Sequence, residues 1–406
     1  MPQQKNDLTR RKFLGRTVAG LAATGLATMA PISAIAQVEG KPEAKKEIIH
    51  RTLGRTGLNI PIVSMGVMNS NNPGVVQASY EMGVRHFDTA AAYQMGRNEQ
   101  MVGAVINRLK ARDKVVIGTK SYSPDQRRGG EPKEVIAEII KLCDGSLSRL
   151  KTDYIDIFYI HSVDNVKTVQ NKVVQEALSK LKEQKKIRFC GVSTHSNMAE
   201  VINAVAADGF FDVVLTGINF TQADDKVLLD AVKNAADKGV GMVGMKTFAG
   251  GSRWPDPESR SKYNNKVINS AAHKWVLSRT AIHTTIPGYD NFDHMKEDFA
   301  AAMDLEFTDE ERSFLADNNV HLSMGYCRQC RKCLATCPND VDVPTLMRTH
   351  MYAAQYGNLA HARMTYDGIA SGRKLDACVS CDECTARCNN TVDISRRIDE
   401  LKMIYA

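Results

Sequence analysis

Three features are missing from this 406-residue sequence. No run of about 20 strongly apolar residues is present, so we expect no stable membrane span once the N-terminal segment is removed. No basic patch marks a nucleic-acid surface, because residues 1–36 carry +4 of the formal net charge of +7 and the rest carries only +3. No G-x-G-x-x-G turn follows the first expected strand, which disfavours a doubly wound dinucleotide-binding sheet.

The first 36 residues have the features of an export signal. The run TRRKFLG (Thr9–Gly15) places a twin arginine before a stretch of Ala, Gly and Leu that ends in Ala34-Ile35-Ala36, an A-x-A cleavage site. This order resembles a Tat signal, which implies transport of the folded protein by the Tat translocase to the periplasm. We predict cleavage after Ala36 and a linker over residues 37–47. An uncleaved membrane anchor is the alternative, disfavoured because Arg16 interrupts the stretch.

Two cysteine runs near the C-terminus share the spacing C-x2-C-x2-C-x3-C. In two-cluster ferredoxins three cysteines of one run hold a cubane and the fourth cysteine of the other run completes it. We therefore predict two [4Fe–4S] clusters rather than disulfides or zinc, which need other spacings. One cluster would be held by Cys327, Cys330, Cys333 and Cys388, and the other by Cys378, Cys381, Cys384 and Cys337.

The segment between the two cysteine runs is rich in helix formers and has no hairpin signal. It resembles the helical two-cluster ferredoxin domain of respiratory iron–sulfur subunits, and we assign residues 319–406 to such a domain. The two other cysteines, Cys143 and Cys190, fall in a helix pattern and a strand pattern and are expected to be small core residues.

Between residues 48 and 318, eight apolar strand patterns alternate with amphipathic helix patterns. The strands are β-branched and nearly continuous, as buried parallel strands are. Eight such units in about 270 residues predict an α/β fold of the (β/α)8 TIM-barrel type, with a doubly wound sheet as the alternative. The segment HRTLGRTGLNI (residues 50–60) is expected to form a hairpin before the first barrel strand.

Four residues follow or end successive strands of this predicted barrel, where barrels place their chemistry. They are Asp88, Tyr93, Lys120 and His161. Reduction of a carbonyl needs a proton donor for the oxygen, and Tyr93 is the candidate. We expect the Lys120 ammonium to favour the tyrosinate and Asp88 to orient Lys120. His161 would hydrogen-bond the oxygen of a small carbonyl or alcohol substrate.

These residues lie in motifs that resemble the aldo/keto reductase family. HFDTAAAYQMGRNE carries Asp88 and Tyr93, IGTK carries Lys120, YIHS carries His161, and GVSTHS follows the fifth strand. The resemblance covers residues 48–318 and implies an oxidoreductase with a complete catalytic tetrad, of the subgroup fused to a ferredoxin domain. It also implies a bound NAD(P), contacted by Ser193, Thr194, Asn219, Lys246, Pro287, Gly288 and Glu297.

The sequence departs from the family at several of the nucleotide positions. Leu215 replaces the usual carboxamide-binding Gln, and Met245 replaces the usual ring that stacks on the nicotinamide. Gly288 and His294 stand where a Lys and an Arg often bind the 2′-phosphate. NAD, NADP and no nucleotide therefore all remain open.

Two functions follow from these observations. The first is an exported oxidoreductase that interconverts carbonyls and alcohols and carries two [4Fe–4S] clusters. The alternative is an iron–sulfur electron-transfer subunit whose barrel is a docking scaffold without nicotinamide binding. A nicotinamide delivers two electrons as hydride, whereas each cluster takes one electron. Two roles therefore stay open for the clusters: electron exchange with a redox protein partner, or a structural role.

Overall fold

The computed structural model describes residues 47–124, 130–250, 262–319, 325–378, 381 and 383–405. These residues belong to one compact unit, Lys46–Ala406. The predicted export signal and the linker up to residue 46 lie outside the described residues. Within the described part of the chain, no helix is both long enough and apolar enough to cross a membrane.

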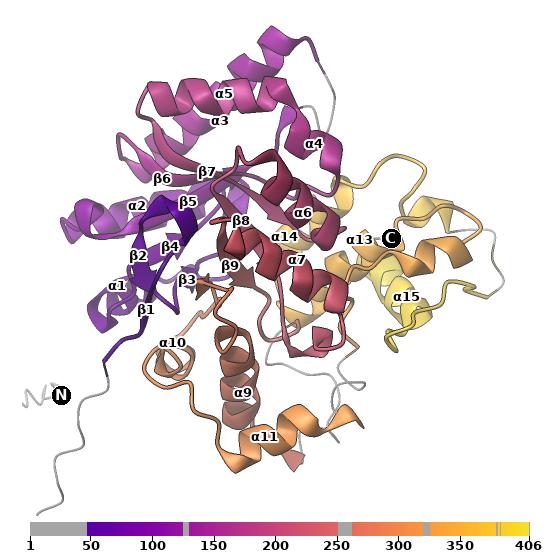
Figure 1. The fold of residues 1–406 in the computed structure, drawn as a ribbon. Coiled ribbons are helices and arrows are strands. Elements are labelled where there is room, and N and C mark those ends of the chain that lie inside the picture. Colours follow the sequence, from indigo (N-terminus) through magenta and orange to yellow (C-terminus); the bar gives the residue numbers. More distant parts are fainter. Residues whose placement is uncertain are drawn as a thin grey trace, which may run out of the picture. The chain divides into compact units, whose positions relative to one another are not determined.

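Eight parallel strands form a barrel in chain order (Figure 1). The sheet closes between its two ends, where Ser64 donates its N–H to the Thr285 carbonyl at 2.8 Å and Thr285 donates to Ile62 at 2.9 Å. This confirms the predicted (β/α)8 barrel. Its strands are β3 (Met65–Gly66), β4 (His86–Asp88), β5 (Val116–Ser121), β6 (Ile155–Ile160), β7 (Ile187–Thr194), β8 (Val213–Gly217), β9 (Gly241–Met245) and β10 (Thr284–Thr285).

Helices surround the barrel on its outer side (Figure 1). Many begin at an Asn, Asp or Thr whose side chain accepts a backbone N–H, as Asn171 and Asn264 do, which supplies a partner to an otherwise unpaired donor. A short additional helix, α4 (Val166–Gln170), follows β6. The expected helices are α1 (Pro73–Met82), α2 (Arg97–Arg108), α3 (Pro132–Leu150), α5 (Lys172–Glu183), α6 (Met198–Asp208), α7 (Lys226–Asp237), α9 (Asn265–Leu277) and α10 (Phe292–Ala300), and α11 (Asp309–Ala316) follows them.

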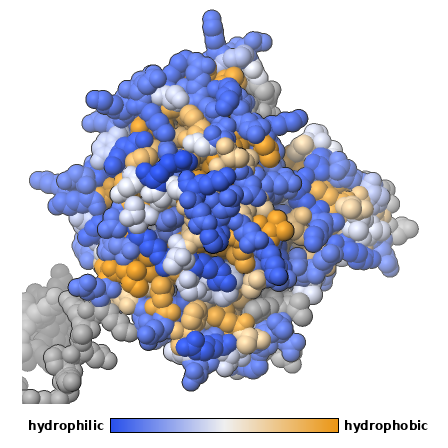
Figure 2. Space-filling view, viewed as in Figure 1, coloured by the Kyte–Doolittle hydropathy of each residue, from blue (hydrophilic) through white to orange (hydrophobic). Residues whose placement is uncertain are grey.

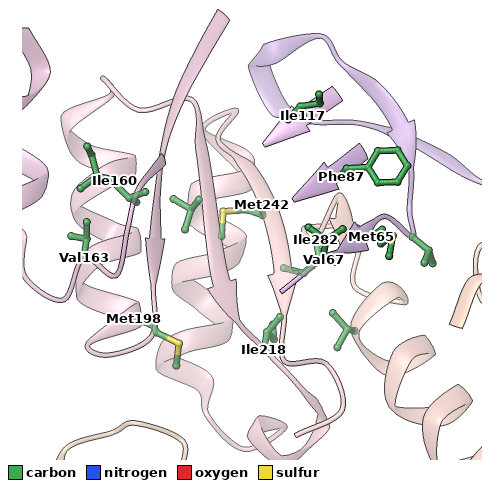
Figure 3. Packing of buried hydrophobic residues seen from close by; sticks show 14 of the residues in the cluster. Met65, Val67, Phe87, Ile117, Ile160, Val163, Met198, Ile218, Met242 and Ile282 are labelled. Carbon is green, nitrogen blue, oxygen red and sulfur yellow. The ribbon is translucent and has the colours of Figure 1, made fainter. Parts of the chain in front are cut away.

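The main hydrophobic core lies between the barrel and the helices. It joins strand residues such as Phe87 and Ile117 to helix residues such as Met198, and Figure 3 shows part of this layer. Cys143 and Cys190 are buried in it, as expected. Every residue of β5 and β6 is buried, as expected for parallel strands that are covered on both faces.

A second, smaller core fills the inside of the barrel. The predicted hairpin is present as β1 (His50–Thr52) paired antiparallel with β2 (Asn59–Pro61). Leu53 and Ile60 from this hairpin pack with interior residues of the barrel strands, including Tyr159 and Leu215. The hairpin residues thus help to fill the inside of the barrel.

The C-terminal region, residues 325–405, is helical in its described part, as expected. It contains α13 (Val343–His350), a π-helical turn η8 (Met351–Gln355), α14 (Leu359–Asp367) and α15 (Ile394–Tyr405), and the cysteines lie in the connecting segments. Leu346, Ile398 and Leu401 build a core of their own. Met351 and Tyr352 instead join the main core of the barrel, which ties the two parts together.

On the face drawn in Figure 2, hydrophilic residues predominate and apolar ones form small, scattered patches. Exposed large apolar side chains include Met95, Val227, Leu359 and Met403. Single exposed apolar residues are common on protein surfaces. Two of them, Met95 and Leu359, adjoin the candidate active site described next.

Candidate active site and cysteine sets

The four predicted catalytic residues meet at one end of the barrel. Asp88 ends β4, Lys120 lies in β5, His161 follows β6, and Tyr93 begins the short 3-10 helix η3 (Tyr93–Gly96). Strands β4, β5 and β6 are parallel neighbours, so their C-terminal ends share one edge of the sheet. The structure therefore brings together all four residues.

A buried ion pair lies at the centre of this group. The Lys120 ammonium pairs with the Asp88 carboxylate and also donates to the Thr89 carbonyl at 2.8 Å. The Lys120 Nζ lies 5.1 Å from the ring centroid of Tyr93. The Tyr93 and His161 rings meet edge to face with centroids 6.2 Å apart. This arrangement leaves Tyr93 facing both a cation and an imidazole.

Burial decides the protonation of Tyr93. It raises the pKa of Tyr93 well above its usual range, and the Asp88 charge raises this pKa further. Burial lowers the pKa of Lys120, with the Asp88 carboxylate acting in the opposite direction. The expected effect of Lys120 on the tyrosinate stays a prediction, because the upward shift of the Tyr93 pKa comes from burial and from neighbouring negative charge. Tyr93 is held as a neutral phenol, the form that can donate a proton.

The backbone after Tyr93 is strained. Gln94 and Met95 have φ values of 50° and 57°, a left-handed conformation that is uncommon for residues other than glycine. Such residues cost on the order of 1–3 kcal/mol each and concentrate at functional sites. The strain lies beside the candidate proton donor, where it fixes the turn that presents Tyr93.

A cavity of about 450 Å³ opens beside Asp88 and Tyr93. Its size is within the range of small-molecule sites, roughly 300–1,000 Å³. The barrel contributes Met245, Lys246, Thr247, Pro287 and Gly288 to its wall, and the C-terminal region contributes Tyr352 and residues 355–360. The candidate active site is thus shared between the barrel and the C-terminal region.

Residues of the C-terminal region reach the candidate proton donor Tyr93. The His361 ring lies edge-on to Tyr93 at 5.5 Å between centroids, and edge-on to Tyr352 at 4.5 Å. Sequence reasoning missed Tyr352, Tyr356 and His361. They stand in an ordinary helix pattern between the cysteine runs, and no local signal shows which helix face meets the barrel.

The predicted nucleotide contacts are only partly brought together. Lys246, Pro287 and Gly288 line the cavity, whereas Ser193, Thr194, Asn219 and Glu297 are not among its lining residues. The Ser193 hydroxyl accepts from the Ser162 N–H at 3.0 Å, and the Thr194 hydroxyl donates to Ser196 at 3.0 Å. The Asn219 amide donates to the Lys246 carbonyl at 3.2 Å. These side chains already have partners inside the protein, and their contact with a nucleotide stays a prediction.

Lys246 occupies an unusual position in the cavity wall. Its Nζ is 3.1 Å from His195 Nδ1 and 3.1 Å from the Tyr352 hydroxyl, and its φ is 58°. Burial and the Arg348 guanidinium hold the pKa of Lys246 well below its usual range, opposed by the Cys327 charge. Burial and the Lys246 charge also lower the pKa of His195, so this imidazole is neutral. In the described part of the chain, no carboxylate forms an ion pair with Lys246.

The eight C-terminal cysteines form two sets, each around its own small cavity. We call Cys327, Cys330, Cys333 and Cys388 the inner set, and Cys337, Cys378, Cys381 and Cys384 the outer set. Each set takes three cysteines from one run and one from the other, which is the grouping that the spacing predicts. All ten cysteines of the chain are free thiols here.

The surroundings of the sulfur atoms fit iron–sulfur ligation. Gln329 Nε2 donates to Cys327 Sγ at 3.2 Å, the Asn390 backbone N–H to Cys388 Sγ at 3.3 Å, and Asn339 Nδ2 to Cys381 Sγ at 3.4 Å. Ligand thiolates accept such hydrogen bonds, which tune the potential of a cluster. The donor atoms present in both sets therefore suit cubane clusters.

Comparison with known proteins gives two family matches. Residues 68–265 match the aldo/keto reductase family, and residues 326–392 match the 4Fe-4S dicluster domain. An L-galactose dehydrogenase of Arabidopsis thaliana is 27% identical over 301 residues, which span 66% of this chain and 92% of the relative. An L-glyceraldehyde 3-phosphate reductase of Escherichia coli O157:H7 is 23% identical over 344 residues, 70% of this chain and 95% of the relative.

Solved structures support the same fold. An aldo-keto reductase from Klebsiella pneumoniae, in complex with NADPH, superimposes with a TM-score of 0.53 and 22% identity over 66% of this chain and 94% of its own. The aldo-keto reductase AKR11C1 from Bacillus halodurans, in its holo form, superimposes with a TM-score of 0.53 and 22% identity. The match covers 68% of this chain and 96% of that protein. These structures show the fold. The two family matches show an aldo/keto reductase domain joined to a 4Fe-4S dicluster domain, which makes the chain an oxidoreductase.

Proposed function

We propose that this oxidoreductase interconverts a small carbonyl compound and its alcohol at the cavity beside Tyr93. The observation that carries the proposal is the position of the Tyr93 phenol, at the cavity edge and next to the Lys120–Asp88 pair. Support also comes from relatives named as a dehydrogenase and a reductase. A nicotinamide nucleotide bound in the cavity would supply or accept the hydride.

The residues of the chain would handle the proton. In reduction the Tyr93 O–H bond breaks and its proton passes to the carbonyl oxygen, while the carbonyl carbon receives the hydride. The phenolate left on Tyr93 is stabilised by the Lys120 ammonium, whose charge Asp88 keeps in place. His161, edge-on to the Tyr93 ring, would orient the substrate oxygen. Oxidation of the alcohol reverses these steps.

We further propose that the inner and outer sets each hold one [4Fe–4S] cluster. The two cavities and the N–H donors to sulfur support this count. Clusters of this type carry one electron each, so a one-electron redox protein is the expected partner.

A second function is favoured by a specific observation at the cavity. Met245 takes the place of a stacking ring, and Ser193, Thr194 and Asn219 are used in internal hydrogen bonds. If the cavity binds no nucleotide, the protein would serve as an electron-transfer subunit whose barrel docks onto a partner. Binding of NAD(H) and NADP(H), measured by titration, separates the two functions.

Export remains a proposal that rests on the sequence. The twin arginine of residues 10–11 and the Ala34-Ile35-Ala36 site support transport by the Tat translocase and a periplasmic location. Replacing both arginines with lysine should retain the protein, uncleaved, in the cytoplasmic fraction. Normal cleavage and location of that variant would contradict the proposal.

The proposed chemistry is tested by Tyr93→Phe in the cluster-loaded protein. Loss of the phenol proton should lower carbonyl reduction about 10²- to 10⁴-fold, a typical contribution of general acid catalysis. Tyr80→Phe on α1, whose ring stacks on Arg85 outside the cavity, is the matched control and should retain full activity. Unchanged turnover in Tyr93→Phe would rule out Tyr93 as the proton donor.

A further inference from the structure

A fourth, smaller cavity lies between the candidate active site and the inner set. Its volume is about 10 Å³, and its lining includes Lys246, Gln355, Arg348 and Cys327. Lys246 and Gln355 also line the catalytic cavity. Cys327 also lines the cavity of the inner set. A continuous set of side chains therefore joins the two sites.

The outer set has no such connection in the described part of the chain. Its cavity is lined by residues between 337 and 398, all from the C-terminal region. Lys402 lies on α15 four residues after Ile398, which lines this cavity, so Lys402 stands on the same helix face beside the outer set. The two sets therefore have different cationic neighbours.

The wall between the active site and the inner set contains three basic side chains. Lys246, Arg348 and Arg397 all line the small cavity together with Cys327. Lys246 also touches the active-site residues His195 and Tyr352 through hydrogen bonds of 3.1 Å. A buried cation without a carboxylate partner is costly, and an anionic iron–sulfur site nearby would offset that cost.

From this arrangement, and resting on the proposed function, we infer that Lys246 and Arg348 couple the catalytic cavity electrostatically to the inner set. The inner set is then the iron–sulfur site nearest the reacting atoms, and the outer set is the site turned away from them. Cations close to a cluster stabilise its more negative reduced form, and buried charges are little screened by salt. Lys246 and Arg348 should therefore raise the reduction potential of the inner cluster selectively.

The test is a redox titration of the full-length, cluster-loaded protein, followed by electron paramagnetic resonance. Lys246→Met and Arg348→Met keep the side-chain bulk and remove the charge. Each should shift the midpoint potential of the inner cluster downward and leave the outer cluster unchanged. Lys402→Met is the matched control and should shift only the outer cluster. Cys330→Ser, which alters an inner ligand, identifies the signal of the inner cluster.

Two outcomes would overturn the inference. The first is an unchanged inner potential in both Lys246→Met and Arg348→Met, and the second is an equal shift of both clusters. Failure of the proposed function looks different. In that case the unmodified protein would contain fewer than two clusters, or Tyr93→Phe would keep its turnover, whatever the potentials do.

Discussion

The ring of Tyr93, at the mouth of the barrel, lies edge-on to the ring of His361 on α14, with their centroids 5.5 Å apart. The C-terminal region thus forms part of the wall around the candidate proton donor. The Asn358 side chain adds a second link by donating to Asn69 Oδ1 at 2.9 Å. Removal of the C-terminal region would therefore open the cavity beside Tyr93 as well as remove the cysteines.

The His361 contact predicts an effect on both packing and turnover. Burial lowers the pKa of His361 to about 3, so its ring is neutral at ordinary pH and acts as a buried aromatic wall. His361→Ala should lower kcat/KM about tenfold and destabilise the protein by about 1–3 kcal/mol, as core truncations do. His361→Phe should retain most of the turnover and most of the stability, because phenylalanine keeps an uncharged aromatic ring at this position. A loss in His361→Phe as large as in His361→Ala would show that the imidazole nitrogens are needed.

The Lys120–Asp88 pair predicts a large loss of stability when one partner is removed. Both side chains are buried, so Lys120→Met leaves a carboxylate without its cation, at a cost of about 3–5 kcal/mol. The double variant Asp88→Asn with Lys120→Met should lose less than the sum of the two single variants. Unfolding in guanidinium measures each free energy. Additive losses would mean that the two charges do not interact.

A close approach of α2 to α3 predicts the sign of a glycine substitution. A Cβ at Gly103 would lie 2.2 Å from the Leu150 carbonyl oxygen. Alanine gains about 1 kcal/mol over glycine in a helix, but overpacking of this kind costs about 1–3 kcal/mol. Gly103→Ala should therefore destabilise the protein. Gly145→Ala on α3, where the nearest atom is the mobile end of Arg149 at 3.1 Å, should be neutral or stabilising.

The capping box of α11 predicts a loss of stability in acid. Glu311 is buried, which by itself raises the pKa of its carboxyl. Hydrogen bonds from Ser270 and the Thr308 N–H, with the Lys274 ammonium, outweigh this and lower the pKa overall. Because the folded pKa is depressed, the stabilisation is complete above the unfolded pKa of about 4.3 and is lost as pH falls through the folded value.

Comparison of the wild type with Glu311→Gln tests this sign. The difference in unfolding free energy should be constant from pH 7 to pH 5 and shrink below about pH 4. Thermal unfolding followed by tryptophan fluorescence measures it. A difference that grows in acid would contradict the assigned direction.

The crossed grouping of the cysteines predicts which cluster each substitution damages. Cys388 belongs to the second run in sequence but lines the cavity of the inner set. Cys388→Ser should therefore alter the same resonance signal as Cys330→Ser, and Cys337→Ser should alter the other. If Cys388→Ser altered the same resonance signal as Cys381→Ser, each cysteine run would instead hold its own cluster.

The sequence alone predicts those parts of the molecule that depend on local pattern. Alternating strands and helices indicate a barrel, and a barrel brings Asp88, Lys120 and His161 together because parallel strands end at one edge. Cysteine spacing likewise predicts the inner and outer sets. Each of these inferences needs only short sequence segments and a general rule of strand arrangement or of cysteine spacing.

What the sequence does not predict depends on long-range packing. His361 contacts Tyr93 from a distant part of the chain, and Tyr352 lines the same cavity. Their helix pattern does not say which face is covered. The raised pKa of Tyr93 follows from its burial, which the presence of a neighbouring lysine does not reveal. Long-range packing also decides which residues line the cavity. Ser193, Thr194 and Asn219 are therefore absent from its lining, although the family resemblance implies that they contact a nucleotide.

The central claim is that one chain joins a nicotinamide-dependent catalytic cavity to two iron–sulfur sites. The most direct test uses protein purified without oxygen. Its native mass is measured, and the iron and any nucleotide released on denaturation are counted in the same sample. We expect about eight irons per chain, as two cubanes require, together with one nicotinamide nucleotide, bound as purified or on titration. Eight irons with no nucleotide bound under either condition would contradict the reductase assignment and favour the electron-transfer subunit.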